Sequence, residues 1–412
     1  MFSSVSIVNS KNSRSNNKWY VLSLTALTFT FAVAMPQICM PVLFKEIAED
    51  LGLNLVEVGV VWGIPALAGL SIVFIGGLLA DRYGARRVMS IACLLGGLAG
   101  AMRGISGDFT SLTLTSFFFG FSIWVMPASM FKTTATWFSG RQLVVANGIV
   151  STGAAFGFTV GAMISATILS PLLGGWRNVV FLYGGISIIF GLLWLLIVKE
   201  PARLGLAGSG GSVPLRQSIS HVFPIKTIWF LGLTLLGYAG CIQGMIGYLP
   251  TYLRDSGWTV ASADGTLAAF NGISTLGAIP LALLADKLGL KKVVLFPVLL
   301  ITIVGVALLS VVDNAMVWVL MIMVGLSRDG FFAISFTMST ETEGIGVVYA
   351  GTAIGLVQTI LNVGSLSSPP LGNSLAEANP GFPFFLWAAF GLLALVAFCF
   401  VKETGWKHKP QL

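Results

Sequence analysis

The segment GGLLADRYGARR at residues 76–87 recurs in a weaker form as ALLADKLGLKK at residues 282–292. The aspartates of the two copies, Asp81 and Asp286, are 205 positions apart. Each copy lies between two long apolar runs, in the same place relative to its neighbours. A repeat on this scale predicts that the chain consists of two halves of similar architecture.

The composition indicates a membrane protein. Hydrophobic residues make up 56% of the 412 positions, charged residues make up 9%, and the mean hydropathy is +0.90. This is more apolar surface than a soluble core buries. Apolar runs near the length that crosses a bilayer recur along the chain. The twelve spanning helices that they predict are 19–43, 57–79, 87–105, 110–137, 143–168, 177–198, 224–250, 260–285, 292–312, 315–339, 347–371 and 382–401.

The distribution of basic residues predicts the orientation of these helices. Lys and Arg number 17 in the tails and even-numbered connections and 4 in the odd-numbered connections, while Lys132 and Arg328 lie within spans. Because basic loops stay on the cytoplasmic side, both termini are expected there, in a plasma membrane. The first apolar run is too long for a cleaved signal, so its polar leader should be retained. The net charge of +7 is therefore a topology signal, and nucleic acid is not an expected partner.

The repeat and the composition together predict the domain organisation. A Gly- and Ser-rich stretch, GLAGSGGS at 205–212, separates the two halves and is typical of a flexible tether. The predicted parts are a cytoplasmic tail at 1–18, a six-helix bundle at 19–198, a linker at 199–222, a second six-helix bundle at 223–401 and a tail at 402–412.

A charged pair interrupts the tenth apolar run. Arg328 and Asp329 lie near the middle of NAMVWVLMIMVGLSRDGFFAISFTMS, residues 314–339. An ionisable group at this depth costs about 2.5–3.5 kcal/mol on insertion scales and usually faces a cavity or a partner. We expect Arg328 to face a polar pathway and bind a carboxylate, and Asp329, about 100° further around the helix, to hold a partner or a proton. A pair that only neutralises itself and stabilises the bundle is the alternative.

On these features the chain resembles the major facilitator superfamily over nearly its whole length. The family's loop motif consists of a Gly, an Asp-Arg pair, a Gly and two basic residues. It is matched here by Gly77, Asp81, Arg82, Gly84, Arg86 and Arg87. The second copy keeps Asp286, Gly289, Lys291 and Lys292 but has Lys287 at the Arg position, which makes it a weaker version of the motif. WFSGRQ at 137–142 and GWRNVVF at 175–181 are also similar to the family. The resemblance implies an all-α membrane protein of twelve helices in two pseudo-symmetric bundles that rock about a midplane site.

The two loop motifs are the expected gating elements. Asp81 would face the N-terminus of a neighbouring helix, while the basic residues would bind acidic or carbonyl groups in one conformation only. The gating candidates are Asp81, Arg82, Arg86, Arg87, Asp286 and Lys287. The alternative is that these charges only anchor the topology.

Further substrate-binding residues are expected on the helices that line the cavity in the resembled fold. Gln37 and Gln243 hold corresponding positions in helices one and seven. Lys132 in helix four would approach the cavity opposite Arg328, although snorkelling to the surface explains it equally well. The remaining candidates are Tyr238, Tyr248, Asn271, Gln358 and Asn362. For each of them, a hydrogen bond between helices is the alternative role.

Several residue types point away from other kinds of site. The four cysteines all fall within predicted helices and should be small buried residues, and neither histidine lies inside a span. No metal site or cofactor is expected, and no nucleophile is paired with a base, so an enzyme is not predicted. The glycines spaced four apart at Gly153, Gly157 and Gly161 are interpreted as a close helix contact.

The predicted function is the transport of a small organic anion. A cationic centre with few acids around it favours a carboxylate as cargo. Asp329 is the only acidic residue near mid-span, so proton coupling is a hypothesis that rests on it. A drug exporter of the same fold is the alternative, although Ala162 follows Gly161 where the resembled exporters tend to have a Gly-Pro pair. A membrane sensor is disfavoured because no soluble domain is appended. The protein is expected to act as a monomer in the bilayer.

Overall fold

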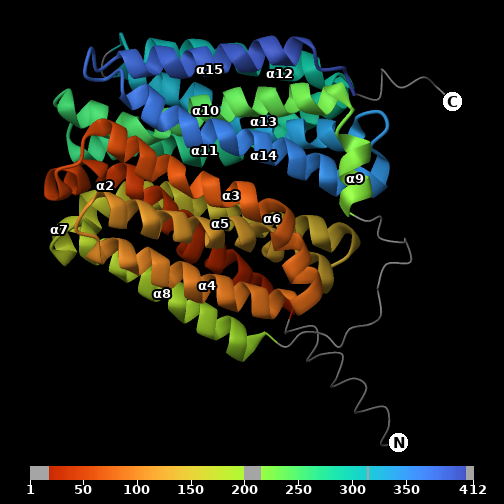
Figure 1. The fold of residues 1–412 in the computed structure, drawn as a ribbon, viewed down its shortest axis with the longest axis horizontal. Coiled ribbons are helices and arrows are strands. Elements are labelled where there is room, and N and C mark those ends of the chain that lie inside the picture. The colour runs from red at the N-terminus through yellow and green to blue at the C-terminus, as the bar shows by residue number, and fades with distance from the viewer. Residues whose placement is uncertain (1–17, 199–214, 313–314, 405–412) are drawn as a thin grey trace, which may run out of the picture.

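The computed structural model describes residues 18–198, 215–312 and 315–404, and this part of the chain contains helices and no strands. Figure 1 shows the helices side by side in two stacked groups, the first (red to yellow-green) below the second (green to blue). We call these groups the N-half, residues 18–198, and the C-half, residues 226–404. The predicted all-α fold with twelve long helices is confirmed.

Each half contains six long helices, some of them with short extensions. In the N-half they are Lys18–Leu51 with its π-helical turn η1 (Phe29–Ala34) and α2 (Met35–Leu51), α3 (Leu55–Tyr83), α4 (Ala85–Met102) with η2 (Arg103–Ile105), α5 (Phe109–Trp137), α6 (Gly140–Ile164) with η3 (Ser165–Leu169) and α7 (Ser170–Leu173), and α8 (Trp176–Ile197). In the C-half they are α10 (Lys226–Asp255), α11 (Val260–Leu288), α12 (Lys291–Leu308), α13 (Ala315–Glu341), α14 (Gly346–Asn373) and α15 (Phe382–Cys399).

Eleven of these helices are long and apolar enough to cross a membrane. The twelfth, α14, is of similar length, and one of its faces lies at the boundary between the halves. The first helix was expected to end near residue 43 and instead continues to Leu51. Hydropathy marks where a helix leaves the apolar layer, whereas the helix itself ends at Gly52, whose φ of 64° terminates it.

Local sequence signals explain the helix ends. Asn54 begins α3 with a capping box, in which its side chain and that of Glu57 each accept a hydrogen bond from the other's backbone N–H. Asp108 caps α5 in the same way with Ser111. The hydrogen bonds from the backbone N–H and the hydroxyl of Ser111 lower the pKa of the Asp108 carboxyl. These caps place two polar connections at one end of the bundle.

Successive helices run between two ends of the bundle. The Lys18 end, on the right in Figure 1, carries Lys18, the start of α6 and the short helix α9 (Leu215–Val222). The Asn54 end carries the connection from α2 to α3 and the connection from α10 to α11. Part of the predicted tether 199–222 is therefore helical. His221 in α9 bonds the carbonyl of Gly344 and stacks on Tyr349, so packing against the C-half holds this segment in place.

Small residues allow the closest helix contacts. A Cβ on Gly157 would lie 2.7 Å from the Thr30 carbonyl oxygen, and one on Gly161 would lie 2.7 Å from Ile38. The predicted close contact of this glycine series is confirmed, with the first helix as its partner. Three of the cysteines are buried as expected, whereas Cys399 is exposed because it ends α15. The halves meet where α3 packs on α14, α6 on α11, and α2 on α10.

Candidate functional site

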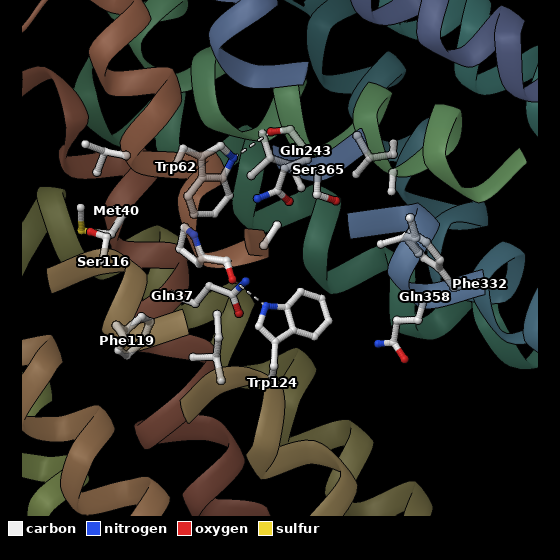
Figure 2. Close-up of a pocket in the computed structure, with 18 of the residues that line it drawn as sticks. Gln37, Met40, Trp62, Ser116, Phe119, Trp124, Gln243, Phe332, Gln358 and Ser365 are labelled. Carbon is white, nitrogen blue, oxygen red and sulfur yellow. Dashed lines mark hydrogen bonds between the residues drawn. The ribbon is translucent and has the colours of Figure 1, made fainter. Parts of the chain in front are cut away.

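A cavity of about 260 Å³ lies between the two halves. Its polar and charged lining comes from both of them, and Figure 2 shows Gln37 and Trp124 of the N-half and Gln243 and Ser365 of the C-half among these side chains. The N-half contributes Gln37, Met40, Val61, Trp62, Pro65, Ala66, Arg103, Ser116, Phe119, Ile123 and Trp124. The C-half contributes Ala239, Ile242, Gln243, Ile246, Arg328, Phe332, Phe336, Gln358, Leu361 and Ser365. Four of the predicted site residues, Arg328, Gln37, Gln243 and Gln358, therefore line one cavity.

Two indole rings are fixed in this cavity by hydrogen bonds. Trp62 Nε1 donates to the carbonyl of Gln243 across the boundary between the halves, at 2.8 Å. Trp124 Nε1 donates to the carbonyl of Pro65 at 3.0 Å, and Figure 2 draws both bonds. Because each N–H is satisfied, the rings present rigid apolar faces to a ligand.

Arg328 lies at the C-half side of the cavity, held by α11. Its Nη1 donates to Oδ1 of Asn271 at 2.8 Å, and its guanidinium lies 5.4 Å from the centre of the Phe270 ring. Its Nε is 3.6 Å from Oδ1 of Asp329, and 19% of the Arg328 side chain remains exposed. The guanidinium is therefore anchored on one side and accessible on the other.

Asp329 faces α11 and is not among the residues that line the cavity. Its backbone N–H donates to Oγ of Ser274 at 3.2 Å, and its Oδ2 accepts a hydrogen bond from Thr275 at 3.5 Å. A Cβ on Gly277 would clash with the Leu326 carbonyl, so α11 and α13 pack in close contact here. This agrees with the expected division, in which Arg328 faces the cavity and its neighbour faces a helix.

Several predicted site residues lie outside this lining. Tyr238 is fully buried and stacks on Phe331, with ring centres 3.9 Å apart. The Tyr248 hydroxyl donates to the carbonyl of Pro380 at 3.2 Å, which directs it toward the Asn54 end. Lys132 is half-buried and is not among the residues that line the cavity. Helical spacing gives the depth of these residues but not the side of the bundle that they face.

The two candidate asparagines are fully or almost fully buried. Asn271 does not line the cavity and acts through its bond to Arg328. Asn362 in α14 lies against Gly69 of α3, where a Cβ on the glycine would come within 2.7 Å of Asn362 Nδ2. Both polar atoms of the Asn362 amide lack a hydrogen-bond partner among the described residues. The site of Asn362 is thus the boundary between the halves and not the cavity wall.

Sequence reasoning missed Arg103 as a cavity residue. It had been counted among the basic residues of the odd-numbered connections, but its guanidinium turns inward and lines the cavity. Its Nη2 donates to the carbonyl of Pro36 at 3.2 Å, near the middle of the first long helix. The available signal was that Arg103 already lies inside the predicted span 87–105.

The gating candidates lie at the Lys18 end, and the side chains of two of them, Asp81 and Arg82, are outside the described residues. The Arg86 guanidinium donates to the Leu195 carbonyl in α8, which is the kind of carbonyl contact that was expected. Arg87, Asp286 and Lys287 are exposed, and Asp286 makes a contact of its own. In the second copy, Glu403 accepts hydrogen bonds from the backbone N–H groups at the start of α12.

The Asn54 end is closed by contacts between the halves. Lys45 Nζ lies 2.6 Å from Oδ1 of Asp255, and Asn373 Nδ2 donates to the Leu55 carbonyl at 2.7 Å. A Cβ on Gly63 would lie 2.5 Å from the Leu366 carbonyl oxygen, so backbone nearly touches backbone. The cavity therefore has no wide opening toward this end.

Comparison with known proteins agrees with this architecture. A family model described as Major Facilitator Superfamily matches residues 22–342. The chain is 24% identical over 218 residues to the hexuronate transporter of Bacillus subtilis (strain 168), a match that spans only 51% of this chain and 50% of that protein. It is 23% identical over 408 residues to the nitrite extrusion protein of the same organism, across 96% of both chains.

A solved structure gives the same fold. The chain superimposes with a TM-score of 0.77 and 17% identity on a bacterial homolog to the human lysosomal transporter Spinster, in an inward-facing and occupied conformation. The match covers 95% of this chain and 98% of the other. With the family model matching most of its length, the chain belongs to the Major Facilitator Superfamily of transporters.

Proposed function

We propose that the protein is a secondary active transporter that moves a small organic anion, a carboxylate, across the plasma membrane by alternating access. The observation that carries this proposal is the cavity between the halves, which holds cationic side chains within a bundle of membrane-spanning helices. Buried cations of this kind are costly unless a negative partner joins them. The relatives named for hexuronate and nitrite support an anion as cargo.

The size of the cavity favours a small cargo over the drug-exporter alternative. Pockets that hold drug-sized ligands are about 300–1,000 Å³, whereas this cavity is about 260 Å³. A lipophilic cation would also meet arginine at the cavity wall and be repelled. The exporter reading therefore has less support than the anion transporter.

Within this proposal each cavity residue has a role. Arg328 binds the anionic group, and Asn271 holds its guanidinium in place. The amides of Gln37, Gln243 and Gln358 can donate to hydroxyl or carboxylate oxygens of the cargo. Asp329 is the proposed proton-coupling residue, since its carboxylate lies next to Arg328 and exchanges that partner when an anion arrives.

The conformation fits an inward-facing state of this transporter. The Asn54 end is closed, and the basic-residue distribution assigns the Lys18 end to the cytoplasm. The loop motifs that contain Asp81 and Asp286 are then the cytoplasmic gate, which forms when the opposite end opens. We propose that one monomer carries out the whole cycle, because the cavity is built within a single chain.

A thermal-shift screen of the purified protein tests this function. The panel is glucuronate, benzoate, nitrate and the lipophilic cation tetraphenylphosphonium. A ligand at 100 times its Kd stabilises the folded state by about 2.7 kcal/mol. We expect stabilisation by a carboxylate that falls sharply in Arg328→Gln and persists in Arg141→Gln, an exposed arginine at the Lys18 end. Stabilisation by tetraphenylphosphonium alone would instead support the exporter.

Flux in proteoliposomes tests the coupling. An imposed proton gradient should drive uptake of the stabilising anion by the wild type, and Asp329→Asn should remove this response while binding persists. Uptake by Asp329→Asn that still follows the gradient in full would exclude this residue as the coupling site.

A further inference from the structure

Arg103 is the most deeply buried arginine of the cavity. Only 2% of its surface is exposed, and its guanidinium lies 4.2 Å from the centre of the Phe119 ring. Besides the bond to the Pro36 carbonyl, its Nε donates to the Gly100 carbonyl at 3.3 Å. These contacts fix the guanidinium at the N-half side of the cavity, across from Arg328.

The charge of Arg103 has no carboxylate partner in the part of the chain that the structure describes. Among the described residues no acidic group comes within 4.0 Å of its guanidinium, and its partners there are neutral carbonyls and one ring. Other inward arginines are compensated, since Arg254 pairs with Asp264 and Arg328 with Asp329. An unpaired buried ion is disfavoured by several kcal/mol. An unpaired guanidinium in the wall of a cavity therefore indicates that a negatively charged ligand pairs with it.

A neighbouring hydroxyl points to the same ligand. Ser116 lies on α5 one turn before Phe119, so the two residues share a face of that helix. Ser116 is 2% exposed and lines the cavity, and its Oγ has no hydrogen-bond partner among the described residues. Figure 2 shows Ser116 and Phe119 on the same side of the pocket. A buried hydroxyl without a partner is as informative as the unpaired charge, because such groups are normally satisfied.

The charges in the cavity limit the charge of the ligand. Arg328 and the adjacent Asp329 together carry no net charge when both are ionised. Arg103 then leaves one net positive charge facing the cavity, which a single negative charge neutralises. A second negative charge on the ligand would have to compete with Asp329 for Arg328.

We propose, building on the anion transport put forward above, that Arg103 and Ser116 complete the binding site for the anionic group on the N-half side, opposite Arg328, and that the cargo is a monocarboxylate with a flat apolar body. The carboxylate accepts hydrogen bonds from the Arg103 guanidinium and the Ser116 hydroxyl. The flat body lies among the rings of Phe119, Trp124 and Trp62. The indole N–H groups of both tryptophans already donate hydrogen bonds to backbone carbonyls, so the ligand meets only the faces of these rings. Arg328 then acts as the second cation, on the other half.

Calorimetric titration of the purified protein with benzoate, glucarate and nitrate tests the subsite. Benzoate is the flat monoanion, glucarate the polar dianion and nitrate the anion without an apolar body. We expect benzoate to bind most tightly. Arg103→Gln should weaken benzoate binding roughly 100-fold or more, and Ser116→Ala about tenfold, as for losing one hydrogen bond to a charged group. Arg141→Gln, an exposed arginine at the Lys18 end, is the control and should bind benzoate like the wild type.

The melting temperature without ligand separates a binding role from a structural one. Removing an uncompensated buried charge should leave the ligand-free melting temperature of Arg103→Gln equal to or above that of the wild type. A lower melting temperature with unchanged benzoate affinity would make Arg103 a structural residue. Ser116→Ala leaves no hydrogen-bond partner unsatisfied, so the melting temperature of this variant should equal that of the wild type. Its loss of benzoate affinity can then be assigned to binding.

The remaining outcomes each decide one proposal. Unchanged benzoate affinity in both Arg103→Gln and Ser116→Ala, with loss in Arg328→Gln, would overturn this subsite and leave anion transport standing. Tighter binding of glucarate than of benzoate would overturn the assignment to a monocarboxylate. If none of the three anions binds the wild type, the proposed function itself fails.

Discussion

The two ends of the boundary between the halves differ in what holds them. At the Asn54 end, Lys45 pairs with Asp255, and Thr167 donates to Asp264, in both cases from one half to the other. At the Lys18 end, the bond from Lys18 to Gln142 joins two helices of the N-half. The bond from Arg86 to the Leu195 carbonyl likewise stays within the N-half. The bond between His221 and the Gly344 carbonyl joins α9 to the C-half. One end is therefore built to join the halves, while these contacts at the other stabilise each half.

Alternating access requires the contacts at the two ends to form in turn. A closed Asn54 end can open only if its contacts across the boundary are replaced by others at the Lys18 end. The free-energy difference between the two states must then be small, because otherwise one state would be permanently occupied. Variants that weaken one end should shift the populations in a direction that the structure specifies.

The largest effect is expected from Asp264→Asn. Asp264 is fully buried at the Asn54 end and pairs with Arg254, whose side chain is 6% exposed. Its Oδ2 also accepts a hydrogen bond from Thr167 of the N-half, at 3.3 Å. Without the carboxylate, Arg254 is unpaired, which costs about 3–5 kcal/mol for as long as the closed Asn54 end keeps it buried, and opening of this end to water relieves that cost. Spin labels at the exposed positions Glu49 and Ser256, one in each half, should move apart in pulsed dipolar spectroscopy.

Asp255→Asn is the matched control for this prediction. It removes an acidic residue at the same end, but one with 56% of its side chain exposed. The label distance should stay near the wild-type value. An equal widening in both variants would contradict the assignment of the effect to burial.

A smaller effect is expected from Gly63→Ala. The new Cβ would lie 2.5 Å from the Leu366 carbonyl oxygen, and backbone atoms cannot swing aside as a side chain can. Overpacking of this kind costs about 1–3 kcal/mol, and here it falls only on the closed Asn54 end. Anion uptake should fall while the protein still reaches the membrane. Gly148→Ala, where a Cβ meets nothing within 4 Å, should transport normally; a defect of the same size there would remove the steric explanation.

Asp81→Asn tests the Lys18 end. If the loop motif forms the cytoplasmic gate, loss of the charge weakens its interaction with a helix N-terminus by about 0.3–1 kcal/mol. Uptake should slow by up to about fivefold, with unchanged insertion into the membrane. Glu343→Gln, an exposed acidic residue at the same end, is the control. Equal flux in the wild type and Asp81→Asn would leave the motif with a topological role only.

The smallest effect is expected from the Lys45–Asp255 pair. Both side chains are partly exposed, so the pair should contribute at most about 1 kcal/mol. Lys45→Asp should raise the uptake rate or slightly shift the distance between the labels at Glu49 and Ser256. The double variant Lys45→Asp with Asp255→Lys should restore the wild-type value. The effect should vanish at high salt because exposed charges are screened. A salt-independent loss that the double variant does not restore would mean that the ion pair is not the cause.

The sequence predicts the fold better than the site. Twelve helices, the repeat and the special position of Arg328 follow from hydropathy and spacing, which depend on the chain alone. Gly52 and Gly257 are 205 positions apart, as Asp81 and Asp286 are, and both adopt positive φ, of 64° and 89°. The tether was only partly predicted, because α9 is held by contacts with Gly344 and Tyr349 that no local pattern encodes.

The cavity wall could be predicted only in part. Gln37 and Gln243 line the cavity, but Tyr238 turns into the core of the C-half, because depth in a helix does not determine its rotation. Arg103 was missed for a related reason. A residue at the end of a span can lie at the surface or reach back inward, and here the contacts of Arg103 in η2 with α2 and α5 decide between the two.

The central claim is that the two ends open in alternation around an anion-binding cavity. Two label pairs in the same protein test it, Glu49 with Ser256 at the Asn54 end and Gln142 with Lys287 at the Lys18 end, all at exposed positions. Their distances are measured in liposomes for the wild type and Gly63→Ala, with and without benzoate. We predict that the first distance lengthens in Gly63→Ala as the second shortens. Distances that change together, or a Gly63→Ala variant that matches the wild type at both ends, would contradict alternating access in this protein.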